Sequence, residues 1–309
     1  MNIYYALRLP FLFIIDFKKT SGFFVLESQL KNSGILFDFN SMKLKSDVQC
    51  NIHTKQLNFD RYHTAFDKCM QHLKNGDTYL INLTFPTEIN VNLNLVEIFN
   101  LSSAKYKLYI PDHFVLFSPE RFISINGNRI STNPMKGTSH VRDDADGSLL
   151  LSDEKENAEH STIVDLLRND LSIIAHDVKV NTFKYLETVE SNKGLLWQMS
   201  SKISGNIRSK YKEYLGDLID AITPAGSVSG APKKRTCEII EEVENYERGF
   251  YTGVCGYFDG LNVDSAVMIR FIEKQGDKLF YKSGGGITAK SVLEDEYNEL
   301  NQKIYVPIF

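Results

Sequence analysis

The fold class of this chain is indicated by residues 114–131, which read FVLFSPERFISINGNRIS. Residues 114–117 and 122–125 are rich in branched and aromatic side chains, which is typical of strands. The dipeptide Asn-Gly at 126–127 favours a two-residue hairpin turn, and a further strand follows at 129–131. This stretch therefore predicts antiparallel strands that follow one another in the chain.

The rest of the sequence alternates short strands with longer helices. Further strands are predicted at residues 9–15, 35–39, 78–85, 250–258, 263–272 and 279–282, and helices at 61–75, 153–175, 206–220, 232–243 and 291–303. Residues 226–232 and 284–286 are predicted to be loops. Because strands outnumber helices and come in hairpin-like pairs, we expect an α+β fold with antiparallel sheets. One compact domain over residues 1–309 is the simplest organisation.

The composition is that of an ordinary globular protein, with 42% hydrophobic and 24% charged residues and a net charge of -4. No nucleic-acid partner is expected, since that would call for a basic face. The apolar run at 9–15 is too short to span a bilayer and ends at Asp16, so we expect a buried strand, no membrane partner and a cytoplasmic protein. The cysteines, Cys50, Cys69, Cys237 and Cys255, include no C-x-x-C pair and are expected to be free thiols.

Two pairs of glutamates stand out near predicted helix ends. Glu156 and Glu159 are three residues apart and share a helix face, and Glu296 and Glu299 have the same spacing. Together these carboxylates could hold a hard cation such as Mg²⁺, which takes oxygen ligands. On spacing alone, solvated helix faces explain both pairs better than a metal site does.

Two glycine-rich segments and one lysine are further candidates. Residues 226–230 precede a helix, and 284–286 would let backbone N–H groups approach a ligand. Neither matches a dinucleotide or Walker A motif, so by themselves both are better explained as turns. Lys136 follows a strand, and a lysine in a turn is normally a surface charge. It becomes a nucleophile only where burial or a cationic neighbour lowers its pKa.

Taken in order, these segments resemble those of the chorismate-utilising enzymes. The matching segments are Ser118–Phe122, Pro134–Thr138, Ala158–His160, Ile163–Leu171, Gly226–Lys233, Arg270, Gly284–Ile287 and Glu296–Glu299. The resemblance implies two large, mainly antiparallel β-sheets packed face to face with helices outside. It also implies a catalytic core at 76–305 after a shortened N-terminal part at 1–75, without the tryptophan-binding pocket of anthranilate synthases.

The resemblance further implies a Mg²⁺ cofactor that holds the ring carboxylate of chorismate. Glu159 and Glu299 occupy the positions of the metal ligands, with Glu156 and Glu296 in supporting positions. The positions of substrate-binding groups are occupied by Ser227, Gly284, Gly285 and Gly286 at the ring carboxylate, by Tyr251, Arg270 and Lys303 at the enolpyruvyl carboxylate, and by Gly137 and Thr138. Glu120 occupies the position of the general acid that helps the C4 hydroxyl to leave.

Lys136 separates the members of this family. Anthranilate synthases usually have alanine there, whereas aminodeoxychorismate synthases have a lysine that attacks C2 of the ring as the C4 hydroxyl leaves. Ammonia then adds at C4 and expels the lysine, which yields 4-amino-4-deoxychorismate for 4-aminobenzoate and folate biosynthesis. The chain has no Gly-x-Cys-x-Gly segment, so we expect ammonia from a separate glutamine amidotransferase subunit. Anthranilate synthase component I and a non-catalytic chorismate-binding relative are the alternatives.

Two positions depart from the family pattern. Leu80 stands where amine-using members have glutamine and water-using members have a lysine that activates water, which argues against a water-using reaction. Gln198 stands where anthranilate synthases have a histidine tied to pyruvate loss. Its presence fits an enzyme that stops at the aminated intermediate.

Overall fold

The computed structural model describes residues 1–39, 48–55, 57–191 and 194–308. The helices are α1 (Asn2–Ala6), α2 (Glu27–Ser33), α3 (Phe59–Asn75), α4 (Leu95–Leu101), α5 (Ser148–Ser152), α6 (Glu154–Ile174), α7 (Leu215–Ile222), α8 (Lys233–Val243) and α9 (Leu293–Gln302), with short 3₁₀ turns η1 (Ser209–Tyr211) and η2 (Gly226–Val228). The strands are β1 (Phe11–Ile15), β2 (Gly22–Leu26), β3 (Leu36–Asp38), β4 (Ile52–Thr54), β5 (Leu80–Val91), β6 (Tyr106–Ile110), β7 (Phe114–Ser118), β8 (Arg121–Asn126), β9 (Arg129–Thr132), β10 (Met135–His140), β11 (Ala175–Ser191), β12 (Gly194–Ile207), β13 (Gly230–Ala231), β14 (Val254–Phe258), β15 (Asn262–Val267), β16 (Phe271–Gln275) and β17 (Lys278–Ile287).

The described strands form two antiparallel sheets, so the predicted α+β class is confirmed. The first, 9-stranded sheet has the order β10-β12-β9-β8-β15-β14-β1-β2, with β11 beside β12. The second, 8-stranded sheet has the order β13-β5-β17-β16-β7-β6-β3, with β4 beside β5. The quoted hairpin stretch contributes to both, because β7 lies in the second sheet and β8–β9 in the first.

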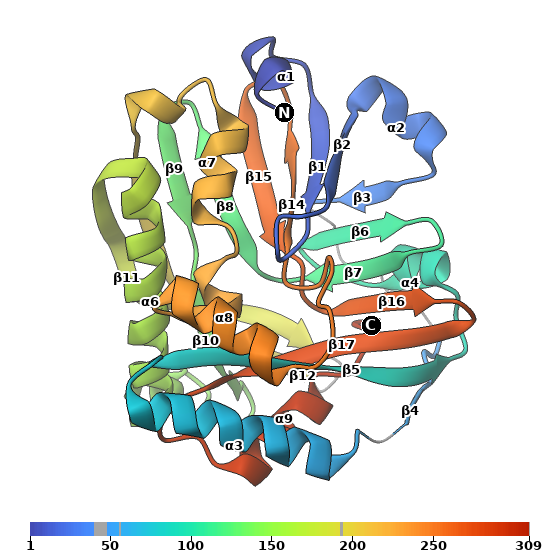
Figure 1. The fold of residues 1–309 in the computed structure, drawn as a ribbon, viewed down its shortest axis with the longest axis vertical. Coiled ribbons are helices and arrows are strands. Elements are labelled where there is room, and N and C mark those ends of the chain that lie inside the picture. The colour runs from blue at the N-terminus through green and yellow to red at the C-terminus, as the bar shows by residue number, and fades with distance from the viewer. Residues whose placement is uncertain (40–47, 56, 192–193, 309) are drawn as a thin grey trace.

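The two sheets pack face to face, with helices on their outer faces (Figure 1). Alternate residues of β1 show how: Leu12 and Ile14 pack between the sheets, whereas Phe11 and Phe13 pack under α6 and α7. Helices α3, α8 and α9 cover the second sheet in the same way. Strand β1 is buried, as the sequence predicts for the apolar run.

Helix α6 is the long helix expected at 153–175. Asp153 caps its N-terminus by accepting a hydrogen bond from the Glu156 amide at 2.9 Å. Glu154 and Glu156 in the first turn also suit the positive end of the helix dipole. Its apolar face, which includes Val164 and Leu167, is buried. That burial fixes the direction in which its polar residues point.

The predicted loop at 284–286 is wrong. These glycines lie inside β17, where Gly284, Gly285 and Gly286 pair with residues of β5. A Cβ on Gly284 would lie 2.5 Å from Thr84 Cγ2 and 2.7 Å from the Leu83 carbonyl oxygen. The glycines therefore permit a close approach of strands.

Other boundaries also differ from the sequence prediction. The helix predicted at 206–220 is wrong over its first part, where β12 runs to Ile207, and only Leu215–Ile222 is α-helical. The strand predicted at 263–272 is two strands, β15 and β16, and the residues between them include Arg270 at φ +53°. The β11–β12 hairpin and helices α1 and α2 were not predicted. No helix in the described part of the chain is long and apolar enough to cross a membrane.

Candidate active site

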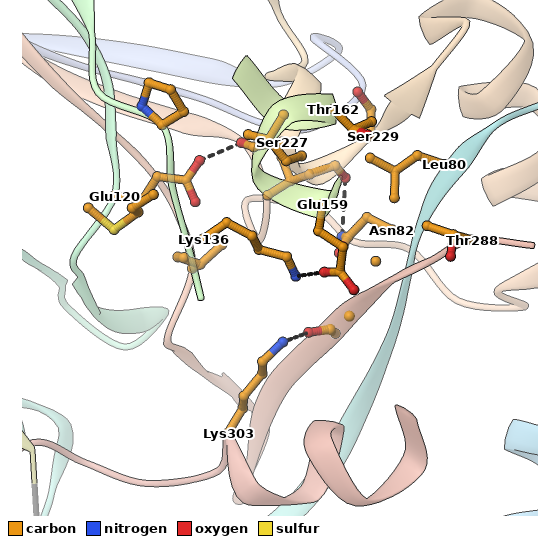
Figure 2. Close-up of a pocket in the computed structure, with 18 of the residues that line it drawn as sticks. Leu80, Asn82, Glu120, Lys136, Glu159, Thr162, Ser227, Ser229, Thr288 and Lys303 are labelled. Carbon is orange, nitrogen blue, oxygen red and sulfur yellow. Dashed lines mark hydrogen bonds and ion pairs between the residues drawn. The ribbon is translucent and has the colours of Figure 1, made fainter. Parts of the chain in front are cut away.

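A cavity of about 870 Å³ brings most of the predicted site residues together (Figure 2). The predicted residues that line it are Glu120, Lys136, Glu159, Ser227, Tyr251, Arg270, Gly284, Gly285, Gly286 and Lys303. The predicted residues outside its lining are Gly137, Thr138, Glu156, Glu296 and Glu299. The lining comes from both sheets, from α6 and from η2, so the cavity lies where these elements meet.

Lys136 points into this cavity. Its strand, β10, pairs with β12, and the register shifts between Met135 and Thr138 at Gly137, which has φ +79°. The shift is a local bulge, a feature that re-aims a side chain. The Lys136 Nζ lies 2.8 Å from Glu159 Oε2, as Figure 2 shows. The side chain is 29% exposed, so this lysine is not an ordinary surface charge.

The carboxylates around Lys136 keep its amine protonated in this arrangement. Burial lowers the pKa of Lys136, but the Glu159 carboxylate, with Glu299 and Glu156 beyond it, raises that pKa by more. Lys136 is thus a cation held against a carboxylate at the cavity wall. A nucleophilic role requires that this proton be lost first.

Glu120 lies between β7 and β8, where its amide donates to the Ser118 hydroxyl at 3.1 Å. Its carboxylate accepts a hydrogen bond from the Ser227 hydroxyl (Figure 2). Burial raises the pKa of Glu120, although Ser227 and Lys136 lower it in part. A carboxyl group with a raised pKa is suited to donate a proton.

Glu299, on α9, is ionised and paired. Its carboxylate lies 2.7 Å from the Lys303 Nζ, which also donates to the Gly284 carbonyl at 2.9 Å. Burial raises the pKa of Glu299, but Lys303, Lys136 and Lys155 lower it by more. Glu299 and Glu159 are therefore two carboxylates, each compensated by a lysine at the same cavity.

Glu156 and Glu296 lie beside these two carboxylates. Burial raises the pKa of both, and each is raised further by the charge of Glu159. The Ser291 hydroxyl donates to Glu296 at 2.8 Å. A Cβ on Gly285, which lines the cavity, would lie 3.4 Å from Glu296 Oε2, so the buried Glu296 carboxylate lies directly behind this part of the cavity wall. These four glutamates thus form a cluster of carboxylates beside the cavity, and lysines pair with two of them, Glu159 and Glu299.

This donor set fits a magnesium ion. Within residues 1–39, 48–55, 57–191 and 194–308, no three His, Cys, Asp or Glu side chains are close enough to hold a metal by themselves. Mg²⁺ does not need such a cluster, because it usually takes one or two carboxylates and completes its shell with waters and substrate oxygens. Glu159 and Glu299 supply two carboxylates of that kind. Burial is the largest cause of the raised pKa values of Glu156 and Glu296, and the charge of Glu159 adds to it; a divalent cation nearby would lower both pKa values.

The part of the cavity around Arg270 suits an anionic group. The Arg270 guanidinium donates to the Lys303 carbonyl at 2.9 Å and lies 4.7 Å from the centre of the Tyr305 ring. Tyr251 is buried beside it, and burial raises the pKa of its hydroxyl, which therefore stays protonated and can donate. Burial lowers the pKa of Lys303, and Glu299 offsets part of that effect. A fixed guanidinium with neighbouring donors is an arrangement that binds carboxylates.

Several residues of the cavity were not predicted. Those with polar side chains are Tyr79, Asn82, Glu154, Lys155, Thr162, Ser229, Tyr281, Lys282, Ser283, Thr288 and Lys290. Leu80 and Asn82 lie two residues apart in β5 and face the same side, so strand periodicity could have indicated Asn82. Lys155 and Lys290 are exposed and carry no sequence signal. Gln198, on β12, pairs with Thr138 of β10 and does not line the cavity.

Comparison with known proteins gives one family. The chain matches the family described as chorismate binding enzyme over residues 30–308. A Haemophilus influenzae protein named "Uncharacterized PabA-like protein" is 42% identical, over 99% of this chain and 95% of that protein. Aminodeoxychorismate synthase component 1 of Bacillus subtilis is 33% identical, over 80% of this chain and 54% of that protein.

A solved structure agrees with these sequence matches. Anthranilate synthase component I of Streptococcus pneumoniae superposes with a TM-score of 0.70 at 28% identity, over 82% of this chain and 58% of that one. The family match includes Lys136, Glu159, Ser227 and Lys303, which meet in the cavity. The chain therefore belongs to the chorismate-binding enzyme family.

Proposed function

We propose that this chain is component I of an aminodeoxychorismate synthase, which converts chorismate and ammonia to 4-amino-4-deoxychorismate for 4-aminobenzoate and folate biosynthesis. The observation that carries the proposal is the position of Lys136, whose amine points into the cavity 2.8 Å from Glu159. A lysine there can form a covalent bond with a ring bound in the same cavity. The similarity to the Bacillus subtilis aminodeoxychorismate synthase component 1 supports the same choice.

The residues divide the work between substrate binding and proton transfer. Arg270 and Tyr251 would bind the enolpyruvyl carboxylate, and Ser227 would lie near the ring. Glu159 and Glu299 would hold Mg²⁺, which supplies positive charge to the ring carboxylate of chorismate.

The chemistry needs two groups that touch the reacting atoms. The Lys136 ammonium releases a proton to water in the cavity, and its free amine attacks C2, while Glu120 gives a proton to the C4 hydroxyl, which leaves as water. Ammonia then adds at C4, and the bond between C2 and Lys136 breaks as the ring double bond is restored. Leu80 places an apolar side chain in the lining, which is consistent with ammonia rather than an activated water as the incoming group.

We further propose that ammonia comes from a separate glutamine amidotransferase subunit. A glutaminase needs an activated thiol, and activation lowers a cysteine pKa. Burial instead raises the pKa of all four thiols, those of Cys50, Cys69, Cys237 and Cys255. The ammonia source is therefore assigned to a partner.

Anthranilate synthase component I remains the second candidate, because the Streptococcus pneumoniae anthranilate synthase has the same fold at 28% identity. The deciding experiment incubates the chain with chorismate, MgCl₂ and ammonium, with and without an aminodeoxychorismate lyase. We expect 4-aminobenzoate only when the lyase is present. Fluorescent anthranilate formed without the lyase would contradict the proposal. Magnesium-dependent chorismate binding without any turnover would indicate the third alternative, a non-catalytic relative.

A further inference from the structure

The contact between Ser227 and Glu120 joins two segments that are far apart in the chain. Ser227 lies in η2, a single 3₁₀ turn, and its hydroxyl donates to the Glu120 carboxylate. Its N-cap residue is Ala225, whose side chain cannot cap the turn. The position of the Ser227 hydroxyl therefore depends on what holds the backbone of the turn.

Asp170, on α6, holds one side of the turn. Its Oδ2 accepts the Gly226 amide at 3.1 Å, and its Oδ1 lies 2.7 Å from the Lys233 Nζ. Lys233 also donates to the Ile222 carbonyl at 2.9 Å. The Asp170 side chain is only 12% exposed, so water competes little for these contacts. One carboxylate thus links α6, η2 and the start of α8.

The turn also lies unusually close to α6. A Cβ on Gly226 would lie 1.7 Å from Leu166 Cδ2 and 2.9 Å from Asp170 Oδ2. A side chain there would have to displace the side chains of Leu166 and Asp170. On the other side, the Val228 carbonyl accepts the Arg248 guanidinium at 2.8 Å. The turn is therefore fixed from both sides by buried charged groups.

Helix α6 connects this turn with the lysine site. Glu159 and Asp170 are eleven residues apart, about three helical turns, and so lie on the same face. We propose that Asp170, together with Lys233, is a positioning residue that holds Ser227 against Glu120. Through α6 it also fixes that pair relative to Glu159 and Lys136. This inference rests on the proposed function, in which Glu120 is the proton donor.

The test variant is Asp170→Asn. The substituted amide side chain has one acceptor oxygen, so it can accept a hydrogen bond from either the Gly226 N–H or the Lys233 amine. Its NH₂ group then faces whichever of these two donors remains. We expect kcat for 4-amino-4-deoxychorismate to fall about 10- to 100-fold, since a displacement of 1 Å is worth that much, with KM within about threefold. The matched control is Asp165→Asn on the exposed side of α6, where Asp165 pairs with Arg168. It should behave as wild type.

The pH profile separates positioning from a merely structural loss. The Ser227 hydrogen bond lowers the pKa of Glu120, so its loss raises that pKa and keeps the acid protonated to higher pH. The falling alkaline limb of kcat/KM should therefore move to higher pH in Asp170→Asn and in Ser227→Ala alike. The double variant should show no further shift and a less than additive loss of kcat.

A measurement without substrate keeps this inference distinct from the proposed function. Amide hydrogen exchange over residues 226–229 should be faster in Asp170→Asn and unchanged in Asp165→Asn. Adding Lys233→Met to Asp170→Asn removes the competing donor and should restore protection. If the turn loosens in this way but wild type makes no 4-amino-4-deoxychorismate, the proposed function fails and the positioning by Asp170 stands. Wild-type exchange and kinetics in Asp170→Asn, or losses fully additive with Ser227→Ala, would overturn the inference.

Discussion

The ion pair of Lys136 with Glu159 shows what the surroundings do to a single residue. By sequence alone this lysine is a surface charge in a turn, but its 2.8 Å contact with Glu159 places it in the cavity wall. The carboxylates that hold it there also keep it protonated. Its reactivity therefore depends on what else binds to Glu159 and Glu299.

Replacement of Lys136 by alanine should remove both the covalent intermediate and the product. We expect the rate of 4-amino-4-deoxychorismate formation to fall by about 10³-fold or more, because the nucleophile is absent. Intact mass spectrometry during turnover should detect a chorismate-derived adduct only on the wild type. Lys202→Ala, at an exposed lysine of the neighbouring strand β12, is the control. An adduct that persists in Lys136→Ala would refute the role.

Removal of one carboxylate should weaken the response to magnesium. Glu299→Gln keeps the shape of the side chain but loses its charge, including its 2.7 Å contact with Lys303. We expect the Mg²⁺ concentration for half-maximal activity to rise about 10- to 100-fold. Glu294→Gln, at an exposed position of the same helix, should leave the response unchanged. An unchanged response in Glu299→Gln would exclude Glu299 as a ligand.

At the level of the element, prediction succeeded where one face of a segment is apolar. Helix α3 was located because its buried residues recur at helical spacing, α6 because a charged start leads into apolar residues, and α8 because Pro232 marks its start. The β11–β12 hairpin was missed because much of its surface is exposed, so its sequence lacks a hydrophobic pattern. The 284–286 segment was misassigned because pairing with β5 outweighs the low strand propensity of glycine.

The bulge in β10 should not tolerate a side chain at Gly137. Alanine there would adopt φ +79° and place its Cβ 2.7 Å from Glu156 Oε2. We expect a loss of stability of more than about 1–3 kcal/mol, the usual cost of the left-handed backbone, together with a loss of activity as Lys136 shifts. Gly127→Ala has a similar φ of +56° with nothing within 4 Å, and should cost about 1 kcal/mol with full activity. Urea unfolding and steady-state kinetics on both variants provide the measurement.

The segment between α8 and β14 depends on a buried ion pair. Arg248 Nη2 lies 2.6 Å from Glu244 Oε1, and both side chains are 2% exposed. Glu244 also accepts the Thr84 amide at 2.8 Å. Arg248→Met would leave the carboxylate buried without its cation, so we expect a loss of about 3–5 kcal/mol in urea unfolding. Arg168→Met breaks an exposed pair with Asp165 and should cost at most about 1 kcal/mol; equal losses in the two variants would contradict this account.

For the whole molecule, the distribution of charge matters more than its sum. The chain has a net charge of -4, yet its cavity has an excess of cations. The charged residues of the lining are Lys136, Lys155, Arg270, Lys282, Lys290 and Lys303 on one side and Glu120, Glu154 and Glu159 on the other. A dianionic substrate is therefore attracted to the cavity although the protein as a whole repels it.

Salt should reveal this local attraction. We expect kcat/KM for chorismate to fall several-fold between about 50 and about 500 mM NaCl, because added salt shortens the distance over which the lysines attract an anion. The value of kcat should change less, since bound substrate is shielded from salt. The double variant Lys155→Gln/Lys290→Gln, at the two exposed lysines of the lining, should show a flatter dependence. An equally steep dependence would show that attraction arises elsewhere.

The site as a whole could be predicted only in part. Sequence motifs pointed to ten residues of the lining, but nothing in the sequence indicated that Thr138 would be exposed, and the alternation along β5 indicates only that Asn82 faces the same side as Leu80. That this side of β5 faces a cavity depends on how β5, β10 and α6 meet, and such contacts between distant segments leave no periodic signal. For the same reason, the hydrogen bond from the Gly226 amide to the Asp170 carboxylate could not be predicted from the sequence.

The position of β1 between β2 and β14 has a consequence for synthesis on the ribosome. Ile15 of β1 pairs with Val254 of β14, so a large part of the chain must be translated before this edge of β1 finds its partner. At about 5–20 residues per second, the wait is on the order of tens of seconds. During that interval the apolar segment Phe11–Ile15 has one strand edge unpaired and lacks most of the core that covers it. The nascent chain thus exposes an apolar strand edge that can pair with other unfolded chains. Folding in the cell should benefit from a chaperone that covers this edge until β14 has been synthesised.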